Sequence, residues 1–166
     1  MIIRDAIKKE LPFIRKQRVI AYSEHVSAIS SEHWQALKQA ISSDADEQQG
    51  VERIVAEHEG EIVGSVALFP AKIDVYEGRV EELDYPEIRV LAVSPEHQGK
   101  GIASALIGEC VKRAQEQGYT AIGLHTGSFM KNAIRLYERM GFERMPQYDF
   151  EPANDGVIVK AFRKCI

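Results

Sequence analysis

The sequence has few cysteines, no long apolar run and no excess of basic residues, and each absence excludes a class of protein. Only 2 of its 166 residues are cysteine, too few for the dense disulfide framework of a small secreted domain. No apolar stretch approaches the roughly 18 residues of a membrane span, and the start does not read as a signal peptide. The formal net charge of -4 disfavours general nucleic-acid binding, which needs a basic surface. We therefore expect a cytoplasmic protein with no membrane or nucleic-acid partner.

The remaining composition is that of an ordinary globular protein. Hydrophobic residues make up 45% of the chain and charged residues 28%, and a chain of this length buries roughly two thirds of the surface that it exposes when unfolded. No internal repeat and no second core is visible, so we expect one domain over residues 1–166. Cys110 falls on an apolar helical face and Cys165 lies beside the C-terminus, and we expect both to be free thiols.

The most informative stretch is residues 87–116. In its first part, 87–93, Ile88, Val90 and Ala92 fall on one face and Leu91 and Val93 on the other. The second half of this stretch is thus apolar on both faces, which predicts a buried central strand. Pro95 should follow the end of this strand, because proline has no amide hydrogen for the ladder. Apolar residues then recur at helical spacing from Ile102, and Gly118 supplies a C-terminal stop. The order is therefore strand, turn, glycine-containing loop and helix.

Gly99 and Gly101 stand directly before this helix. Glycine lets the backbone approach a ligand closely, and the amides of the first helical turn have no partner inside the helix. The helix dipole contributes roughly 0.3–1 kcal/mol towards an anion, and charge-assisted amide bonds add to it. Lys100 could supply further positive charge. Such an arrangement can bind phosphate, but the two glycines alone favour a helix start without a ligand, and only the surrounding residues favour a phosphate-binding loop.

Two motifs in the chain resemble those of the GCN5-related N-acetyltransferase (GNAT) superfamily. Residues 98–103, Gln-Gly-Lys-Gly-Ile-Ala, follow a strand that ends in Leu-x-Val-x-Pro. They fit the Gln/Arg-x-x-Gly-x-Gly/Ala loop with which that family binds the pyrophosphate of acetyl-CoA. Residues 133–142, Ala-Ile-Arg-Leu-Tyr-Glu-Arg-Met-Gly-Phe, resemble the family's Ala-x-x-Leu-Tyr-x-x-x-Gly-Phe helix and turn. The flanking strands extend the resemblance over nearly the whole chain.

The resemblance implies an α/β fold, α+β by some schemes, built on a central mixed and twisted sheet. About seven strands would be flanked by about four helices, and two parallel strands in the middle would splay apart. The sequence places strands at 1–4, 53–57, 62–69, 87–93 and 119–126, an antiparallel closing pair at 143–150 and 157–163, and helices from Leu11, after Ser31, from Ile102 and over 130–139. Pro12 fits a first helical turn, and Gly141 should end the last helix.

Predictions can also be made for two polar connections and for one possible helix cap. Residues 42–50 are expected to be a solvated loop, since they lack the glycine and glutamate spacing of a calcium site. Asp5 is expected to cap the backbone that follows it. The connection 70–85 contains four acids that could line an entrance for an acceptor or could simply be solvated: Glu77, Glu81, Glu82 and Asp84.

The resemblance also implies the cosubstrate, acetyl-CoA, and its contacts, with no metal. In the family the pantetheine arm inserts between the splayed strands and bonds to the backbone of the first of them. The cofactor-binding residues predicted in this way are Leu91, Ala92, Val93, Gln98, Gly99, Lys100, Gly101, Ile102, Ala103 and Ser104. A backbone amide near Val93 would stabilise the oxyanion. Many relatives carry a cofactor-contacting Asn at the position of Met130, and Asn132 is out of register with it, so this contact is not transferred.

Glu87 is the predicted general base. Acetyl transfer needs a neutral amine, and a lysine-like amine has a pKa of about 10.4, so that freeing it near pH 7 costs roughly 4–5 kcal/mol. In one branch of the family a glutamate seven residues before the strand-ending serine has this role, and Glu87 stands seven residues before Ser94. Glu87 could instead pair with Arg89, which lies on the same strand face. His125, near the mouth of the splayed strands, is the other candidate base.

Tyr137 is the predicted general acid. It occupies the tyrosine of the family's Leu-Tyr pair, and a phenol with a pKa near 10 can donate a proton to the departing CoA thiolate. The alternative is a core aromatic of an amphipathic helix. No cysteine falls in the two motifs, so we expect direct transfer in a ternary complex and no acetyl-cysteine intermediate.

We therefore expect an acetyl-CoA-dependent N-acetyltransferase that acts on a primary amine, either a small molecule or a peptide. Relatives are often dimers, so the assembly that the resemblance implies is a homodimer. The alternative is a non-catalytic acyl-CoA sensor or interaction module on the same fold, which would need the loop but neither Glu87 nor Tyr137. A dinucleotide-binding oxidoreductase fits poorly, because the loop lacks the third glycine of that fingerprint.

Overall fold

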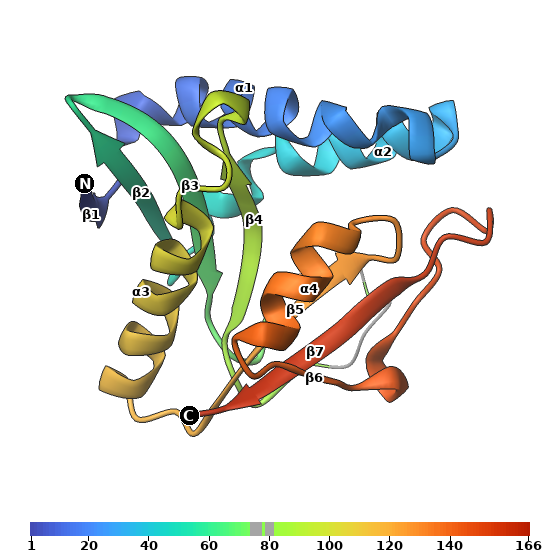
Figure 1. The fold of residues 1–166 in the computed structure, drawn as a ribbon. Coiled ribbons are helices and arrows are strands. Elements are labelled where there is room, and N and C mark those ends of the chain that lie inside the picture. The colour runs from blue at the N-terminus through green and yellow to red at the C-terminus, as the bar shows by residue number, and fades with distance from the viewer. Residues whose placement is uncertain (74–77, 79–81) are drawn as a thin grey trace.

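The computed structural model describes residues 1–73, 78 and 82–166, and its centre is a seven-stranded sheet in the order β1-β2-β3-β4-β5-β7-β6 (Figure 1). The strands are β1 (Ile2–Asp5), β2 (Glu52–His58), β3 (Glu61–Phe69), β4 (Glu87–Val93), β5 (Ala121–Gly127), β6 (Glu143–Arg144) and β7 (Val159–Cys165). The α-helices are α1 (Leu11–Tyr22), α2 (Ser31–Ile41), α3 (Ile102–Glu116) and α4 (Lys131–Arg139). Short 3-10 turns are η1 (Lys8–Glu10), η2 (Ser23–Ala28), η3 (Asp44–Glu47), η4 (Pro95–His97) and η5 (Pro146–Tyr148). The mixed sheet with four helices confirms the expected fold.

Helices cover both faces of the sheet. Ile54 of β2 belongs to the larger core, which also contains residues of α3 and α4, whereas the next residue, Val55, packs with Leu11 and Ile14 of α1. Since side chains alternate along a strand, α3 and α4 lie on one face and α1 on the other. Figure 1 shows α3 and α4 in front of the sheet and α1 and α2 together across its top. No helix within the described parts of the chain has the length and apolar character to cross a bilayer.

Several local predictions are confirmed. Helix α1 begins at Leu11 with Pro12 in its first turn, and β2 and β3 form an antiparallel hairpin. Gly118 and Gly141 follow α3 and α4 with φ values of 88° and 91°, the left-handed conformation that ends a helix. Cys110 and Cys165 are both free thiols.

The closing pair of strands differs from the prediction. Strand β6 is only two residues long, and η5 follows it from Pro146. Proline cannot donate to a ladder, which explains why the predicted strand 143–150 stops early and resumes only as an isolated bridge between Phe150 and Val159. The prediction for Asp5 is also wrong, because Asp5 ends β1 and its carboxylate accepts a hydrogen bond from Arg113 at 2.6 Å.

The predicted solvated loop at 42–50 contains a buried ion pair. Asp46 is 3% exposed and accepts hydrogen bonds from Arg18 and Arg15, each at 2.7 Å. Arg18 is 1% exposed and also donates to the carbonyl oxygen of Ile41. These hydrogen bonds hold the loop against α1. Burial alone would raise the pKa of Asp46, but the hydrogen bonds and positive charges of the two arginines lower it overall.

We expect Asp46→Asn to lower the free energy of unfolding by about 3–5 kcal/mol, because it leaves Arg18 buried without its counter-charge. Glu47→Gln is the matched control, since Glu47 pairs with Arg15 in the same turn but its side chain is 35% exposed; its cost should stay below about 1 kcal/mol. Denaturant unfolding of both variants provides the comparison. Equal losses would show that Asp46 contributes no more than a surface pair.

The same carboxylate should contribute to acid denaturation. Because the pKa of Asp46 is lower in the folded state than in the unfolded one, its stabilisation is present above the unfolded value of about 3.9 and is lost as the pH falls through the lowered value. This part of the decline in stability below about pH 4 should be missing from the Asp46→Asn variant.

Candidate active site

A cleft of about 520 Å³ opens beside the C-terminal half of β4. Its walls come from the end of α1 and the start of η2, from β4, from the loop before α3, and from one face of α4. The lining residues outside β4 and the loop are Ala21, Tyr22, Glu24, His25, Met130, Asn132, Ala133, Leu136, Tyr137 and Arg139. Segments that lie far apart in the sequence therefore meet around one volume.

Nearly all predicted cofactor-binding residues line this cleft. They are Leu91, Ala92, Val93, Gln98, Gly99, Gly101, Ile102, Ala103 and Ser104. Lys100 is exposed and is not part of the lining, so its contribution stays a prediction. The two motif segments, 98–104 and 133–137, thus face the same space, as the pattern indicates.

The loop before α3 presents free amides to the cleft. Gly99 and Gly101 have φ values of 76° and 81°, and a Cβ atom at either position would meet no other atom within 4 Å. Glycine is favoured there by the left-handed backbone and not by lack of space. The first helical bond runs from the amide of Ala105 to the carbonyl of Gly101 at 3.1 Å, so the preceding amides, 102–104, have no partner in the helix. An anion fits this position.

Ser94 and His97 fix the start of the loop. The amide of Ser94 donates to the carbonyl of Val63 on β3 at 2.9 Å, and its hydroxyl lies 2.8 Å from Nδ1 of His97. His97 itself lines the cleft. The sequence showed only that Pro95 ends the strand, and it held no signal for this serine–histidine contact.

Strand β4 contains a bulge next to the cleft. Ser65 and Ala67 of β3 are two residues apart, but their partners on β4, Ala92 and Arg89, are three apart. Val90, inside the bulge, has a φ of 51°. A positive φ at a β-branched residue is unusual and costs roughly 1–3 kcal/mol, a cost that is found mainly at functional sites. The bulge also breaks the regular alternation that we expected along residues 87–93.

Strands β4 and β5 pair only at their beginnings. Their parallel register consists of Glu87 opposite Gly123 and Ile88 opposite Leu124. Beyond these residues the two strands diverge, as Figure 1 shows in the centre of the sheet. The expected splay is confirmed, and it exposes backbone groups of β4 beside the cleft.

Tyr137, on α4, is one of the residues that line the cleft. It is 6% exposed, and its ring contacts Phe142 and Phe162 with centroids 6.0 and 6.4 Å away. Burial raises the pKa of its phenol, with smaller contributions from Tyr22 and Cys110. The phenol is therefore protonated at neutral pH. Tyr137 is both a core aromatic and a cleft residue, so its packing fits the alternative reading and its role as general acid stays a prediction.

Tyr22 lines the same cleft from the end of α1, although the sequence analysis assigned no site residue there. Burial raises the pKa of its phenol, and the positive charges of Arg18 and Arg89 oppose that shift. Two protonated phenols from opposite walls thus border the cleft. Only the packing of α1 against β4 brings Tyr22 here, and no local motif contains it.

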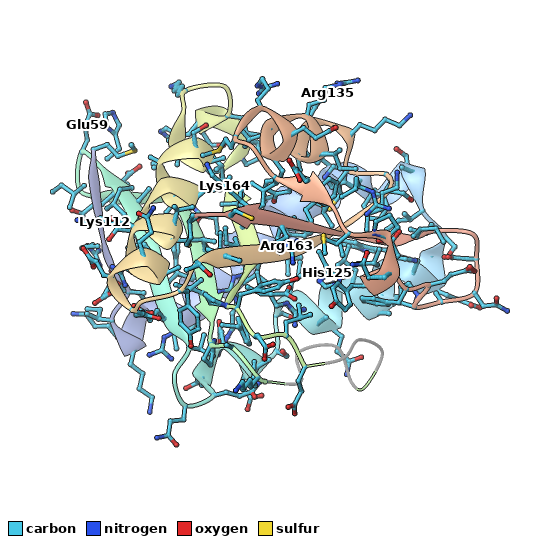
Figure 2. All side chains as sticks on the ribbon, turned by 90° about the horizontal axis from the view of Figure 1, so that it is seen from below. Glu59, Lys112, His125, Arg135, Arg163 and Lys164 are labelled. Atoms are coloured by element: carbon cyan, nitrogen blue, oxygen red, sulfur yellow. The ribbon has the colours of Figure 1, made fainter. Side chains whose placement is uncertain are left out.

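Glu87 and His125, the two candidate bases, contact each other. Oε2 of Glu87 lies 3.0 Å from Nδ1 of His125, and Nε2 of His125 lies 3.0 Å from the carbonyl oxygen of Tyr148. Figure 2 shows His125 on β5 beside Arg163 of the neighbouring strand β7. Arg89, the alternative partner of Glu87, places its guanidinium 5.5 Å from the centre of the Phe69 ring. Neither Glu87 nor His125 is part of the cleft lining.

Two further predicted positions can be placed. Met130 precedes α4, lines the cleft and accepts a weak hydrogen bond from the hydroxyl of Thr126 at 3.5 Å. Asn132 also lines the cleft, although its amide oxygen accepts from Arg135 at 3.0 Å. Of the four acids in the connection, Glu82 and Asp84 are exposed, and Glu77 and Glu81 lie outside the described residues.

Comparison with known proteins finds acetyltransferases both among family models and among sequence relatives. Residues 17–142 match the model of the acetyltransferase (GNAT) family. N-acetyltransferase family 8 member 2 of Rattus norvegicus is 40% identical over 94 residues, which are 57% of this chain and 39% of that protein. N-acetyltransferase 8 of the same organism is 41% identical over 90 residues, 54% of this chain and 38% of that protein. The aligned part thus spans about two fifths of the length of these relatives.

Solved structures resemble the chain over almost its full length. A GNAT-family acetyltransferase from Staphylococcus aureus superimposes with a TM-score of 0.72 at 14% identity, covering 99% of this chain and 98% of that one. The PaiA N-acetyltransferase of Thermoplasma acidophilum, solved in complex with coenzyme A, gives 0.71 at 15% identity, with coverages of 99% and 98%. At such identities the likeness shows the fold alone.

Proposed function

This chain belongs to the acetyltransferase (GNAT) family, and from that membership we propose that it transfers the acetyl group of acetyl-CoA to an acceptor amine by direct attack in a ternary complex. The observation that carries the proposal is the cleft in which the loop 98–104, the diverging strands and the protonated Tyr137 meet. A CoA complex of a protein with the same fold supports the choice of cosubstrate.

The parts of the cleft suit the parts of acetyl-CoA. The loop amides and the start of α3 would bind the pyrophosphate. The backbone of Leu91, Ala92 and Val93 lies beside the splay, and it would bond to the amides of the pantetheine arm as a neighbouring strand does. Acetyl-CoA supplies the thioester carbonyl that the amine attacks. An amide near Val93 would then stabilise the negative charge that forms on the carbonyl oxygen, and such donors are worth roughly 2.7–4 kcal/mol elsewhere.

The proton transfers are assigned to two side chains. In the proposed reaction Glu87 accepts the proton of the acceptor ammonium, whose nitrogen then forms the bond to the acetyl carbon. The carbon–sulfur bond breaks, and Tyr137 donates its proton or a hydrogen bond to the departing thiolate. The second proton that the nitrogen loses as the amide forms restores the phenol of Tyr137. Glu87 lies outside the cleft lining, so a water molecule between it and the amine is part of this proposal.

The acceptor is a primary amine in this proposal, of small-molecule or peptide class. The remaining parts of the proposal are a cytoplasmic location, no nucleic-acid or membrane partner, no metal, and a homodimer as in many relatives. Each follows from family membership and composition and not from a contact in the structure.

The test is acetyl-CoA-dependent thiol release against a panel of amines and peptides, with acetyl-CoA binding measured in parallel by calorimetry. Release with one class of acceptor, together with the acetylated product by mass spectrometry, would establish the enzyme. Binding without release across the panel would instead support an acyl-CoA sensor. Absence of binding would contradict the proposal at its first step.

A further inference from the structure

The contact between Glu87 and His125 sits at the point where β4 and β5 begin to diverge. Glu87 is opposite Gly123, and His125 is two residues further along β5, on the same face of the sheet. Gly123 leaves room on that face for the ring of Tyr85, whose Cε2 lies 2.5 Å from where a Cβ would stand. Glu87, His125 and Tyr85 therefore gather at one site on this face of the sheet.

Neighbouring charges border this site. Burial and the negative charge of Glu87 raise the pKa of Tyr85 to about 12. Arg163 lies on the same face, since it is opposite Gly123. Asp149 stands nearby: burial would raise its pKa, but hydrogen bonds from Arg144 and the Ala161 amide, together with the charge of His125, lower it.

The hydrogen-bond geometry limits where the protons of Glu87 and His125 can lie. Nε2 of His125 faces a carbonyl oxygen, that of Tyr148, which can only accept, so Nε2 must carry a hydrogen. Nδ1 faces a carboxylate oxygen at 3.0 Å, and two lone pairs cannot meet at that distance without a proton between them. Either His125 carries both ring protons and Glu87 is ionised, or His125 is neutral and Glu87 holds the proton. In both cases one proton lies in the contact.

The proposed reaction, and not burial, selects between the two arrangements, because a base must be unprotonated before it can accept a proton. Glu87 is 4% exposed, and the side chain of His125 is 2% exposed. A buried carboxylate is stable only when a positive charge or several donors compensate it, and an imidazolium at 3.0 Å supplies that compensation. The ionised pair is the arrangement in which Glu87 can still accept a proton from an amine.

We propose that His125 is the positioning residue of this site: it donates from Nδ1 to Glu87, holds the buried carboxylate ionised in one orientation, and is itself held by the carbonyl of Tyr148. The inference rests on the proposed acetyl transfer, in which Glu87 is the base. His125 does not accept the amine proton itself. It makes Glu87 able to do so, and the two residues that the sequence offered as alternative bases become one unit.

Two variants, each with an amide nitrogen in place of one ring nitrogen of His125, separate this role from a structural one. Asn at position 125 places a side-chain donor near the position of Nδ1, towards Glu87, whereas Gln places one near the position of Nε2, towards Tyr148. We expect His125→Asn to keep kcat within about 10-fold of the parent and His125→Gln to lose about 100-fold, as Glu87→Gln does. The KM for acetyl-CoA should stay within about twofold in all three. An Asn variant that is no more active than the Gln variant would overturn the proposal.

A double variant tests whether the two residues act as one unit. Because His125 acts through Glu87, the combination of Glu87→Gln and His125→Gln should lose no more activity than Glu87→Gln alone. Losses that multiply would show independent roles and contradict the proposal. Melting temperatures and acetyl-CoA affinity of each variant confirm that the protein is folded.

The proton count can be read without any acceptor. In the ¹⁵N-labelled parent protein, ring-nitrogen spectra near neutral pH should show a hydrogen on both Nδ1 and Nε2 of His125. In Glu87→Gln, where Nδ1 no longer faces a carboxylate, the Nδ1 signal should change. A bare Nδ1 in the parent would overturn the proposal. Because this readout needs no turnover, a failure to find acetyl transfer would count against the proposed function alone.

Discussion

Replacing Gly101 by Asp is expected to weaken acetyl-CoA binding by at least about 100-fold, which corresponds to about 2.7 kcal/mol. Gly101 precedes α3 with a φ of 81°, and the amides that follow it face the cleft. A carboxylate there would occupy the position proposed for phosphate, adding like-charge repulsion while competing for the same amide donors, each worth roughly 1.5–3 kcal/mol towards a charged group. Calorimetric titration with acetyl-CoA measures the change.

Gly118→Asp is the matched control for this substitution. Gly118 has a similar φ of 88°, a Cβ there would also meet no atom within 4 Å, and it lies just beyond the opposite end of the same helix. The backbone strain is therefore comparable, but no phosphate site is involved. We expect acetyl-CoA affinity within about twofold of the parent. If both variants bind equally well, the loop is not the phosphate site.

Tyr137→Phe should lower kcat by about 100-fold, or about 2.7 kcal/mol, while acetyl-CoA affinity changes little. The ring would still pack against Phe142 and Phe162, so only the hydroxyl that we propose as proton donor to the thiolate is lost. Initial-rate kinetics over both substrates separate kcat from KM. Tyr119→Phe, outside the cleft lining, is the control and should leave kcat unchanged. Equal turnover in the parent and the Tyr137 variant would remove the acid role.

The pH dependence offers a second check on Tyr137. Burial raises the pKa of its phenol above the ordinary value of about 10, so the acid form persists through the neutral and mildly alkaline range. The parent enzyme should therefore show no loss of kcat from this group below about pH 10. A decline near pH 8 that disappears in Tyr137→Phe would contradict the environment described for this residue.

The half of the site that we propose for the cosubstrate could be predicted from the sequence because it is encoded locally. Gly99 and Gly101 form a loop whose shape depends on their own backbone angles, and Tyr137 follows from the helical register of its motif. Such features need only short-range information, so a stretch of about ten residues identifies them. The parallel direction of the two central strands followed from the crossover rule, and their splay followed from the family resemblance.

The contacts between distant residues, in the site and outside it, could not be predicted, although Glu87 and His125 were each named as candidate bases. Arg18 and Asp46 are 28 residues apart, and Glu87 and His125 are 38 apart. The charged residues of 42–50 look like a solvated loop until α1 is packed over them. The bulge at Val90 likewise reflects pairing with β3, and the residue itself favours a regular strand.

The divergence of β4 and β5 leaves the central sheet incomplete on its own. Amides and carbonyls at the end of β4 have lost the neighbour that a continuous sheet would give them, and water must serve them until a ligand arrives. A pantetheine arm bonded there would act as a missing strand, so the cosubstrate would finish the fold as well as supply the acetyl group. Because such a ligand binds only the folded state, its concentration would set the thermal stability of the protein and the hydrogen exchange of this seam.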